Sequence, residues 1–188
     1  MKRDVYDEIP VMESTGFLLR EINRETDAEA LLRVYSDEAA VPFFNSDNCA
    51  NGFYFVSIEE IENLISFWKE EYEKRYYVRW AVVDKKSDSA IGTMELFNRK
   101  ADDYFNQCGL LRLDLRSDYE KQNVIEDILA VILPKTKEMF GCDKIATKAV
   151  PIAKERIAAL EQTGFCLADE FLVGHDGTKY GSYYVKEV

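Results

Sequence analysis

The sequence has few of the residues from which catalytic and metal sites are most often built. Its one histidine, His175, lies in the turn-forming run Gly174–Gly177. A Ser-His-Asp or Cys-His mechanism would have to take its base from that turn, so neither is expected. The cysteines are scattered and include no C-x-x-C pair: Cys49, Cys108, Cys142 and Cys166. Zinc sites need clusters of cysteine and histidine, so the sequence predicts no metal site.

The sequence also lacks a net positive charge and long apolar runs. The formal net charge is −11, and the lysines and arginines form no basic stripe. This composition argues against nucleic acid and against anionic membranes as partners. No apolar run approaches the roughly 20 residues of a membrane span, and the N-terminus lacks the apolar region of a signal peptide. We expect a cytoplasmic protein whose cysteines are buried free thiols.

The sequence does contain enough apolar residues to form a hydrophobic core. The 188 residues are 47% hydrophobic and 13% aromatic, which is enough for one folded domain. Residues 1–16 alternate charged with single apolar residues and include Pro10 and Gly16. We expect a loosely held leader at 1–16 and a single domain at 17–188.

The central element is the stretch from Cys108 to Phe140. Alternating leucines up to Leu115 predict a strand with one apolar face. Apolar residues at three- and four-residue steps after it predict a helix. Ser117 and Glu120 between them have the spacing of a capping box, so the strand is expected to turn directly into a helix N-terminus. Backbone N–H groups at such a junction form a natural anion site.

The rest of the chain supplies strands and helices in a mixed order. Capping boxes at Thr26–Glu29 and Ser57–Glu60 predict helix starts, and Pro134 is expected to kink or shorten the central helix. Gly92 predicts a bulge or a close backbone approach. Expected strands are 17–22, 77–83, 90–98, 108–115, 143–150, 165–173 and 179–186, with a further helix at 151–163. This order predicts an α+β domain whose mixed, largely antiparallel sheet has helices on both faces.

The aromatic residues of segment 41–56 allow two interpretations of its role. Its phenylalanines and the turn signal Asn51-Gly52 are compatible with a lining for a pocket or with a flap that packs on the core. Aromatic side chains are usually buried for hydrophobic reasons, which favours packing.

Several strings in this order resemble the GNAT superfamily of acetyl-CoA-dependent N-acetyltransferases, in the branch of the ribosomal-protein alanine acetyltransferases. Each string is weak alone, but their order and spacing are specific for the fold. They are Leu18–Leu32, Trp80–Asp84 with Ala90–Thr93, the strand–helix unit at 108–140, and Leu160–Phe165. The resemblance covers residues 17–186 and implies a seven-stranded sheet of the GNAT type.

The resemblance also implies a site for acetyl-CoA as co-substrate. In the family, the fourth strand and the next helix hold the coenzyme, and a Q/R-x-x-G-x-G/A loop wraps its pyrophosphate with backbone N–H groups. Carried onto this chain, the strand donors lie at Leu113 to Leu115. The loop positions are Lys121, Gln122, Asn123, Val124 and Ile125. Lys121 and Asn123 stand where the family has glycines, so side chains crowd the place of the pyrophosphate.

A second departure lies in the helix after the fifth strand. Positions where the family often has an asparagine, a small residue and a tyrosine hold Ala153, Arg156 and Leu160. The coenzyme-binding amide and the thiolate-protonating phenol are therefore missing, although Tyr183 or Tyr184 on the last strand could supply a phenol.

Two functions remain open at this stage. The first is transfer of acetyl from acetyl-CoA to a small-molecule or peptide amine, by direct attack in a ternary complex. In that mechanism Asp114 or Glu95 steers a base water. The alternative for these carboxylates is structural pairing, either Arg112 with Asp114 or cross-strand partners. The second function is a catalytically degenerate ligand-binding or protein-interaction module that has lost acetyl-CoA. The oligomeric state stays open, a dimer being one alternative.

Overall fold

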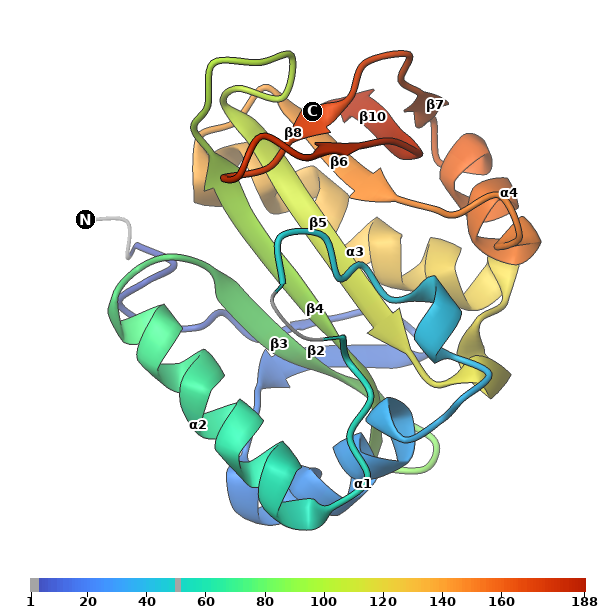
Figure 1. Ribbon diagram of the computed structural model, residues 1–188. Coiled ribbons are helices and arrows are strands. Elements are labelled where there is room, and N and C mark those ends of the chain that lie inside the picture. Colours follow the sequence, from blue (N-terminus) through green and yellow to red (C-terminus); the bar gives the residue numbers. More distant parts are fainter. Residues whose placement is uncertain (1–3, 50–51) are drawn as a thin grey trace.

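The structure, a computed structural model, describes residues 4–49 and 52–188 (Figure 1). Its helices are α1 Arg24–Tyr35, α2 Ile58–Glu73, α3 Gln122–Phe140 and α4 Lys154–Gln162, with single 3-10 turns at Val41–Phe43 and Ser117–Tyr119. The main sheet contains, in spatial order, β1 Met12–Glu13, β2 Phe17–Glu21, β3 Val78–Asp84, β4 Ser89–Arg99, β5 Cys108–Leu115, β6 Lys144–Lys148, β10 Tyr183–Glu187 and β7 Cys166–Leu167. A separate hairpin is formed by β8 Leu172–Val173 and β9 Lys179–Tyr180.

The predicted mixed, largely antiparallel sheet is confirmed. Its one parallel pair is β5 with β6, which runs from Cys108 opposite Lys144 to Leu111 opposite Thr147. Beyond Leu111 the two strands separate, so the last residues of β5 pair only with β4 on one edge. The main sheet has eight strands in the described residues rather than seven, because Met12–Glu13 adds an edge strand beside β2.

Helices cover both faces of the sheet, as expected (Figure 1). α1 and α2 pack on one face against Ala81, Val83 and Ala90, together with the buried Trp68 of α2. α3 lies on the other face, against a cluster that includes Trp80, Leu111, Leu113 and Leu115. Since side chains alternate along a strand, Arg112 and Asp114 of β5 point to the α1/α2 face.

Three of the predicted helix starts can be compared with the structure. Ser57 and Glu60 form the predicted capping box at α2. The other two predictions are wrong. α1 begins at Arg24 because the Asn23 side chain accepts from the amides of Glu25 and Thr26. α3 begins at Gln122 because Ser117–Tyr119 form their own 3-10 turn. Pro134 lies inside α3 without ending it.

The described part of the leader is packed rather than loosely held. Val5 and Met12 are buried in the main core. The Trp80 indole donates a hydrogen bond of 2.9 Å to the carbonyl of Pro10. All four cysteines are free thiols; Cys108 and Cys142 are buried, but Cys166 is exposed on the edge strand β7. Across residues 4–49 and 52–188, no helix is long and apolar enough to cross a membrane.

Candidate functional site

The separation of β5 from β6 leaves backbone groups of β5 free of strand partners, and Arg156 occupies this gap. Its Nη1 donates to the carbonyl oxygen of Leu113 at 2.8 Å. Its Nε and Nη2 donate to the two carboxylate oxygens of Glu120 at 2.6 and 2.7 Å. Arg156 is 3% exposed and Glu120 is 9% exposed. The gap therefore contains a buried, bidentate ion pair that is also tied to the strand.

Local structure explains how these two residues meet. The 3-10 turn at Ser117–Tyr119 ends β5 and carries Glu120 to the start of α3. α4 begins at Lys154, so Arg156 lies in its first turn, on the face that also buries Ala159 and Leu160. α3 and α4 pack against each other on the same side of the sheet (Figure 1). The predicted capping role of Glu120 is wrong, because its carboxylate is taken by Arg156.

Three N–H groups at the junction of β5 and α3 are occupied as well. The amide of Gln122, the first residue of α3, donates to Glu155 of α4 at 2.9 Å. The amide of Lys121 donates to the carbonyl of Tyr119 at 2.8 Å. The amide of Ser117 donates to Asp37 at 2.8 Å. Burial raises the pKa of Asp37, but the hydrogen bonds from Ser117, Ala39 and Ala40 outweigh it and leave this pKa below its usual value. Two of these amides thus already have a carboxylate partner, whereas the N-cap residue Lys121 makes no side-chain hydrogen bond to the first turn of α3.

The predicted coenzyme residues fall into two groups. Leu113, Leu115 and Ile125 are buried in the core cluster under α3. Lys121 and Asn123 are exposed, and Gln122 and Val124 are half-buried. Leu113 and Gln122 are linked through α4, because Arg156 bonds to Leu113 and the neighbouring Glu155 bonds to Gln122. Sequence reasoning noted Arg156 as a departure from the family but did not anticipate the roles of Glu155, Arg156 and Glu120 as partners.

These contacts test whether acetyl-CoA fits. A coenzyme arm between β5 and β6 would compete with Arg156 for the Leu113 carbonyl. A pyrophosphate at the start of α3 would compete with Glu155 for the Gln122 amide and would meet the charge of Asp37. Like charges at short range repel, and Arg156 is already neutralised by Glu120. The residues present do not fit the coenzyme without rearrangement.

The α1/α2 face holds a second group of charges, which includes both predicted catalytic residues. Glu95 accepts from Nη2 of Arg79 and forms an ion pair with Arg112 at 3.3 Å. Asp114 accepts from the Tyr35 hydroxyl at 3.1 Å and lies 3.4 Å from Nη1 of Arg79. Burial raises the pKa of Asp114, although Arg79 and Arg156 oppose the shift. Of the two structural alternatives, the Arg112–Asp114 pair is wrong and cross-strand pairing is confirmed, because Arg112 lies directly across the ladder from Glu95 and pairs with it.

The described parts of the segment 41–56, residues 41–49 and 52–56, lie over this face of the sheet (Figure 1). Phe44 and Phe53 pack on Tyr35 with ring centroids 5.4 and 6.1 Å apart, so these side chains follow the packing interpretation. The turn signal Asn51-Gly52 is only partly testable, because Asn51 lies outside the described residues.

Asp47 fixes this segment to the sheet. Its carboxylate accepts from Lys148 at 2.6 Å and from the Tyr183 hydroxyl at 3.0 Å. Its carbonyl accepts from Arg112 at 2.9 Å. Burial, followed by the charge of Asp47, raises the pKa of Tyr183 well above its usual value. The Tyr183 phenol named as a proton donor is therefore buried and bonded to a carboxylate.

Comparisons with known proteins agree with this architecture. The family described as "Acetyltransferase (GNAT) domain" matches residues 17–166. A comparison with curated protein sequences finds no match.

Among solved structures, the ribosomal-protein-S5-alanine acetyltransferase from Vibrio fischeri is 16% identical, with a TM-score of 0.68, and 95% of this chain aligns with 96% of that one. A GCN5-related N-acetyltransferase from Brucella melitensis is 14% identical, with a TM-score of 0.70, over 96% of this chain and 79% of that one. RimL, a ribosomal L7/L12 α-N-protein acetyltransferase solved with coenzyme A, is 13% identical, with a TM-score of 0.68, over 95% and 98% of the two chains.

At these identities the solved structures establish the fold, and the family match establishes membership. The match spans most of the chain and includes β5, α3, β6 and α4, the elements around the gap. This chain belongs to the GNAT acetyltransferase domain family.

Proposed function

We propose that this chain is a GNAT-fold ligand-binding or protein-interaction module that does not use acetyl-CoA. The observation that carries the proposal is the position of Arg156. Its guanidinium bonds the free edge of β5 at Leu113 and neutralises Glu120 inside the gap. A ligand arm that bonds the Leu113 carbonyl would have to displace Arg156, and separating Arg156 from Glu120 would leave an uncompensated buried charge.

The contacts of Glu155 support the same conclusion. A helix N-terminus attracts anions because its first N–H groups lack partners and its dipole is positive there. In this chain the Glu155 carboxylate already supplies the negative charge and accepts from Gln122. Two consecutive residues of α4 thus occupy one amide at the start of α3 and one carbonyl on the free edge of β5, which supports the proposal.

Titration with acetyl-CoA tests the proposal. A ligand present at a hundredfold excess over its Kd stabilises the fold by about 2.7 kcal/mol, which for a chain of this size raises Tm by roughly 5–10 °C. We expect no shift in Tm and no calorimetric heat at millimolar acetyl-CoA. The double variant Arg156→Ser/Glu120→Gln removes both charges together and should be the form in which weak affinity appears. Lys154→Ser, an exposed change on the same helix, is the matched control and should leave the wild-type result unchanged.

Acetyl transfer from acetyl-CoA to an amine is the second candidate. Membership in the GNAT family and the preserved separation of β5 and β6 favour it. In that case the acceptor would be a small-molecule or peptide amine, with Asp114 or Glu95 steering a base water. Two of the solved neighbours are named as acetyltransferases of ribosomal proteins, which favours a peptide amine. Micromolar binding of acetyl-CoA by the wild-type chain would establish this candidate and overturn the first.

A further inference from the structure

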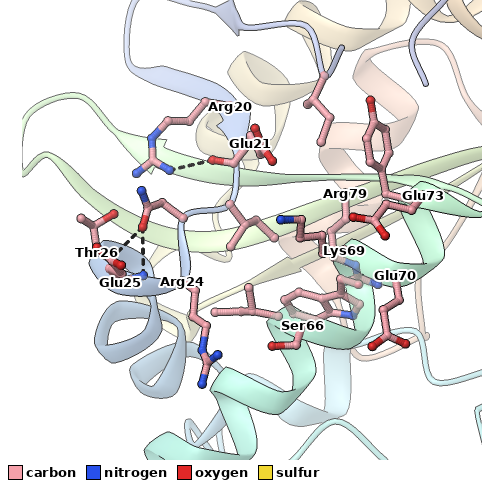
Figure 2. A pocket seen from close by; sticks show the side chains of 16 residues that line it. Arg20, Glu21, Arg24, Glu25, Thr26, Ser66, Lys69, Glu70, Glu73 and Arg79 are labelled. Carbon is pink, nitrogen blue, oxygen red and sulfur yellow. Dashed lines mark hydrogen bonds between the residues drawn. The ribbon is translucent and has the colours of Figure 1, made fainter. Parts of the chain in front are cut away.

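A groove with a volume of about 990 Å³ lies between α2 and the junction of β2 with α1 (Figure 2). The register aligns Glu21 of β2 with Trp80 of β3, Met94 of β4 and Leu113 of β5 in one row across the sheet. The groove is therefore level with the β5–β6 gap but lies beside β2, three strands away from β5. Its α2 side chains Ile65 and Trp68 belong to the core on the α1/α2 face. The groove is therefore laterally separate from the coenzyme site of the family.

Apolar side chains from three segments line the groove. They are Ile9 of the leader, Ile22 after β2, and Ile65, Trp68 and Tyr72 of α2. Ile65 and Trp68 are buried, and Ile9, Ile22 and Tyr72 are half-buried. Apolar surface of this kind binds side chains or aliphatic stems of a partner.

Most charged side chains on the rim of the groove that have no ion-pair partner among the described residues are negative. Each arginine that lines the groove already has an ion-pair partner: Arg20 pairs with Asp27, Arg24 with Glu62, and Arg79 with Glu95. Lys69 forms no ion pair with a residue that the structure describes. Within residues 4–49 and 52–188, the same holds for the four carboxylates that line the groove, namely Glu21, Glu25, Glu70 and Glu73. Figure 2 shows Glu21 and Glu25 on the β2–α1 side and Glu70 and Glu73 on α2.

We infer that this groove is a docking site for a basic, amphipathic peptide segment of a partner protein. The lysine or arginine stems of such a segment would lie along the apolar floor while their charged ends reach the carboxylates. Charge complementarity selects this occupant, because four carboxylates surround a single unpaired lysine. The inference holds whichever function the β5–β6 gap has.

Calorimetric titration with two synthetic peptides tests the inference. One peptide alternates lysine with leucine, and the other has glutamate in place of lysine. We expect the lysine peptide to bind and the glutamate peptide not to bind. Binding should weaken as salt is raised from ~0.05 to ~0.5 M, because exposed charges are screened.

Three variants locate the site. Glu21→Gln/Glu70→Gln/Glu73→Gln should weaken binding about tenfold, the size expected when roughly three exposed ion pairs are lost together. Lys69→Gln removes the opposing charge and should strengthen binding about twofold. Glu29→Gln/Glu59→Gln/Glu161→Gln changes exposed carboxylates outside the groove and should weaken binding no more than twofold.

The remaining outcomes overturn the inference. Absence of binding at millimolar lysine peptide excludes the site. Equal weakening by the groove and control triple variants shows binding to the overall acidic surface. Lys2 and Arg3 lie outside the described residues, so the titration is repeated with a chain that begins at Asp4. If binding appears only in that shorter chain, the groove belongs to the protein's own N-terminus.

Discussion

The substitution Arg156→Met probes the ion pair that closes the gap. It keeps an unbranched side chain of similar length but removes the guanidinium. Glu120, whose side chain is 6% exposed, then keeps its charge without a partner, and the carbonyl of Leu113 loses its donor. Removing one partner of a buried pair costs about 3–5 kcal/mol, because the remaining charge is desolvated and uncompensated.

The expected effect is large enough for ordinary unfolding experiments. For a chain of this length each kcal/mol shifts Tm by roughly 2–4 °C, so Arg156→Met should lower Tm by about 6–20 °C. Circular dichroism gives Tm, and urea titration gives the free energy of unfolding. Lys154→Met, on the exposed side of α4, should change Tm by about 2 °C or less.

A double-mutant cycle separates the pair from the packing of each side chain. Glu120→Gln/Arg156→Met leaves no unpaired charge in the gap, so it should be less destabilising than the sum of the two single changes by about 1–3 kcal/mol. Additive single changes would refute the reasoning, because they would mean that the two groups do not interact in the folded protein. An unchanged Tm for Arg156→Met would refute it more directly.

Two further predictions concern the strand ladder and the C-terminal hairpin. Gly92→Ala should prevent soluble expression or lower Tm strongly, since a Cβ there would lie 2.0 Å from the Asp114 carbonyl, whereas Gly52→Ala, with nothing within 4 Å, should be neutral by the same thermal scan. Burial raises the pKa of Asp103, but Arg99 and the amides of Val173 and Phe105 outweigh it and depress this pKa below its usual value. These bonds therefore stabilise the folded state fully at pH values above about 3.9, the pKa of aspartate in the unfolded chain. The stabilisation is lost as the pH falls through the lower pKa that Asp103 has in the folded state. The protection factor of the Val173 amide against hydrogen exchange should fall across that acid range in the wild type, and Asp103→Asn should remove this dependence; a protection factor that does not change with pH in the wild type would contradict it.

The sheet was predictable because its signals are local and repeated. Alternation along β3, β4 and β5, together with the polar connections between them, led to the antiparallel order and to the parallel return of β6. Gly92 was predicted to mark a bulge or a close approach, and both occur, since the ladder shifts register at Val82 and Val83 and leaves no room for a Cβ. Regular backbone pairing depends on patterns that are visible over a few residues.

The ends of helices were less predictable, since they are decided by competition among nearby side chains. Ser117 and Glu120 have the spacing of a capping box, but Arg156, 36 positions away from Glu120, takes its carboxylate. Likewise, the amide of Ser117 is taken by Asp37 from beyond α1. Tertiary partners of this kind are invisible to a local motif, so the sequence did not show that the first amide of α3, that of Gln122, is taken by Glu155.

A signal for the closed gap was nevertheless present in the sequence. Ala153, Arg156 and Leu160 recur at helical spacing, and all three are buried. A charged residue on the buried face of a helix requires a partner, because an isolated charge inside a protein is costly. No such signal marks Glu120, because its neighbours from Ser117 to Asn123 are mostly polar. The substitutions at Lys121 and Asn123 are more conspicuous, but both side chains are exposed and can turn away from a ligand. Glu120 and Arg156 cannot move independently, so the charged residue on the buried face is stronger evidence about this site than the missing glycines.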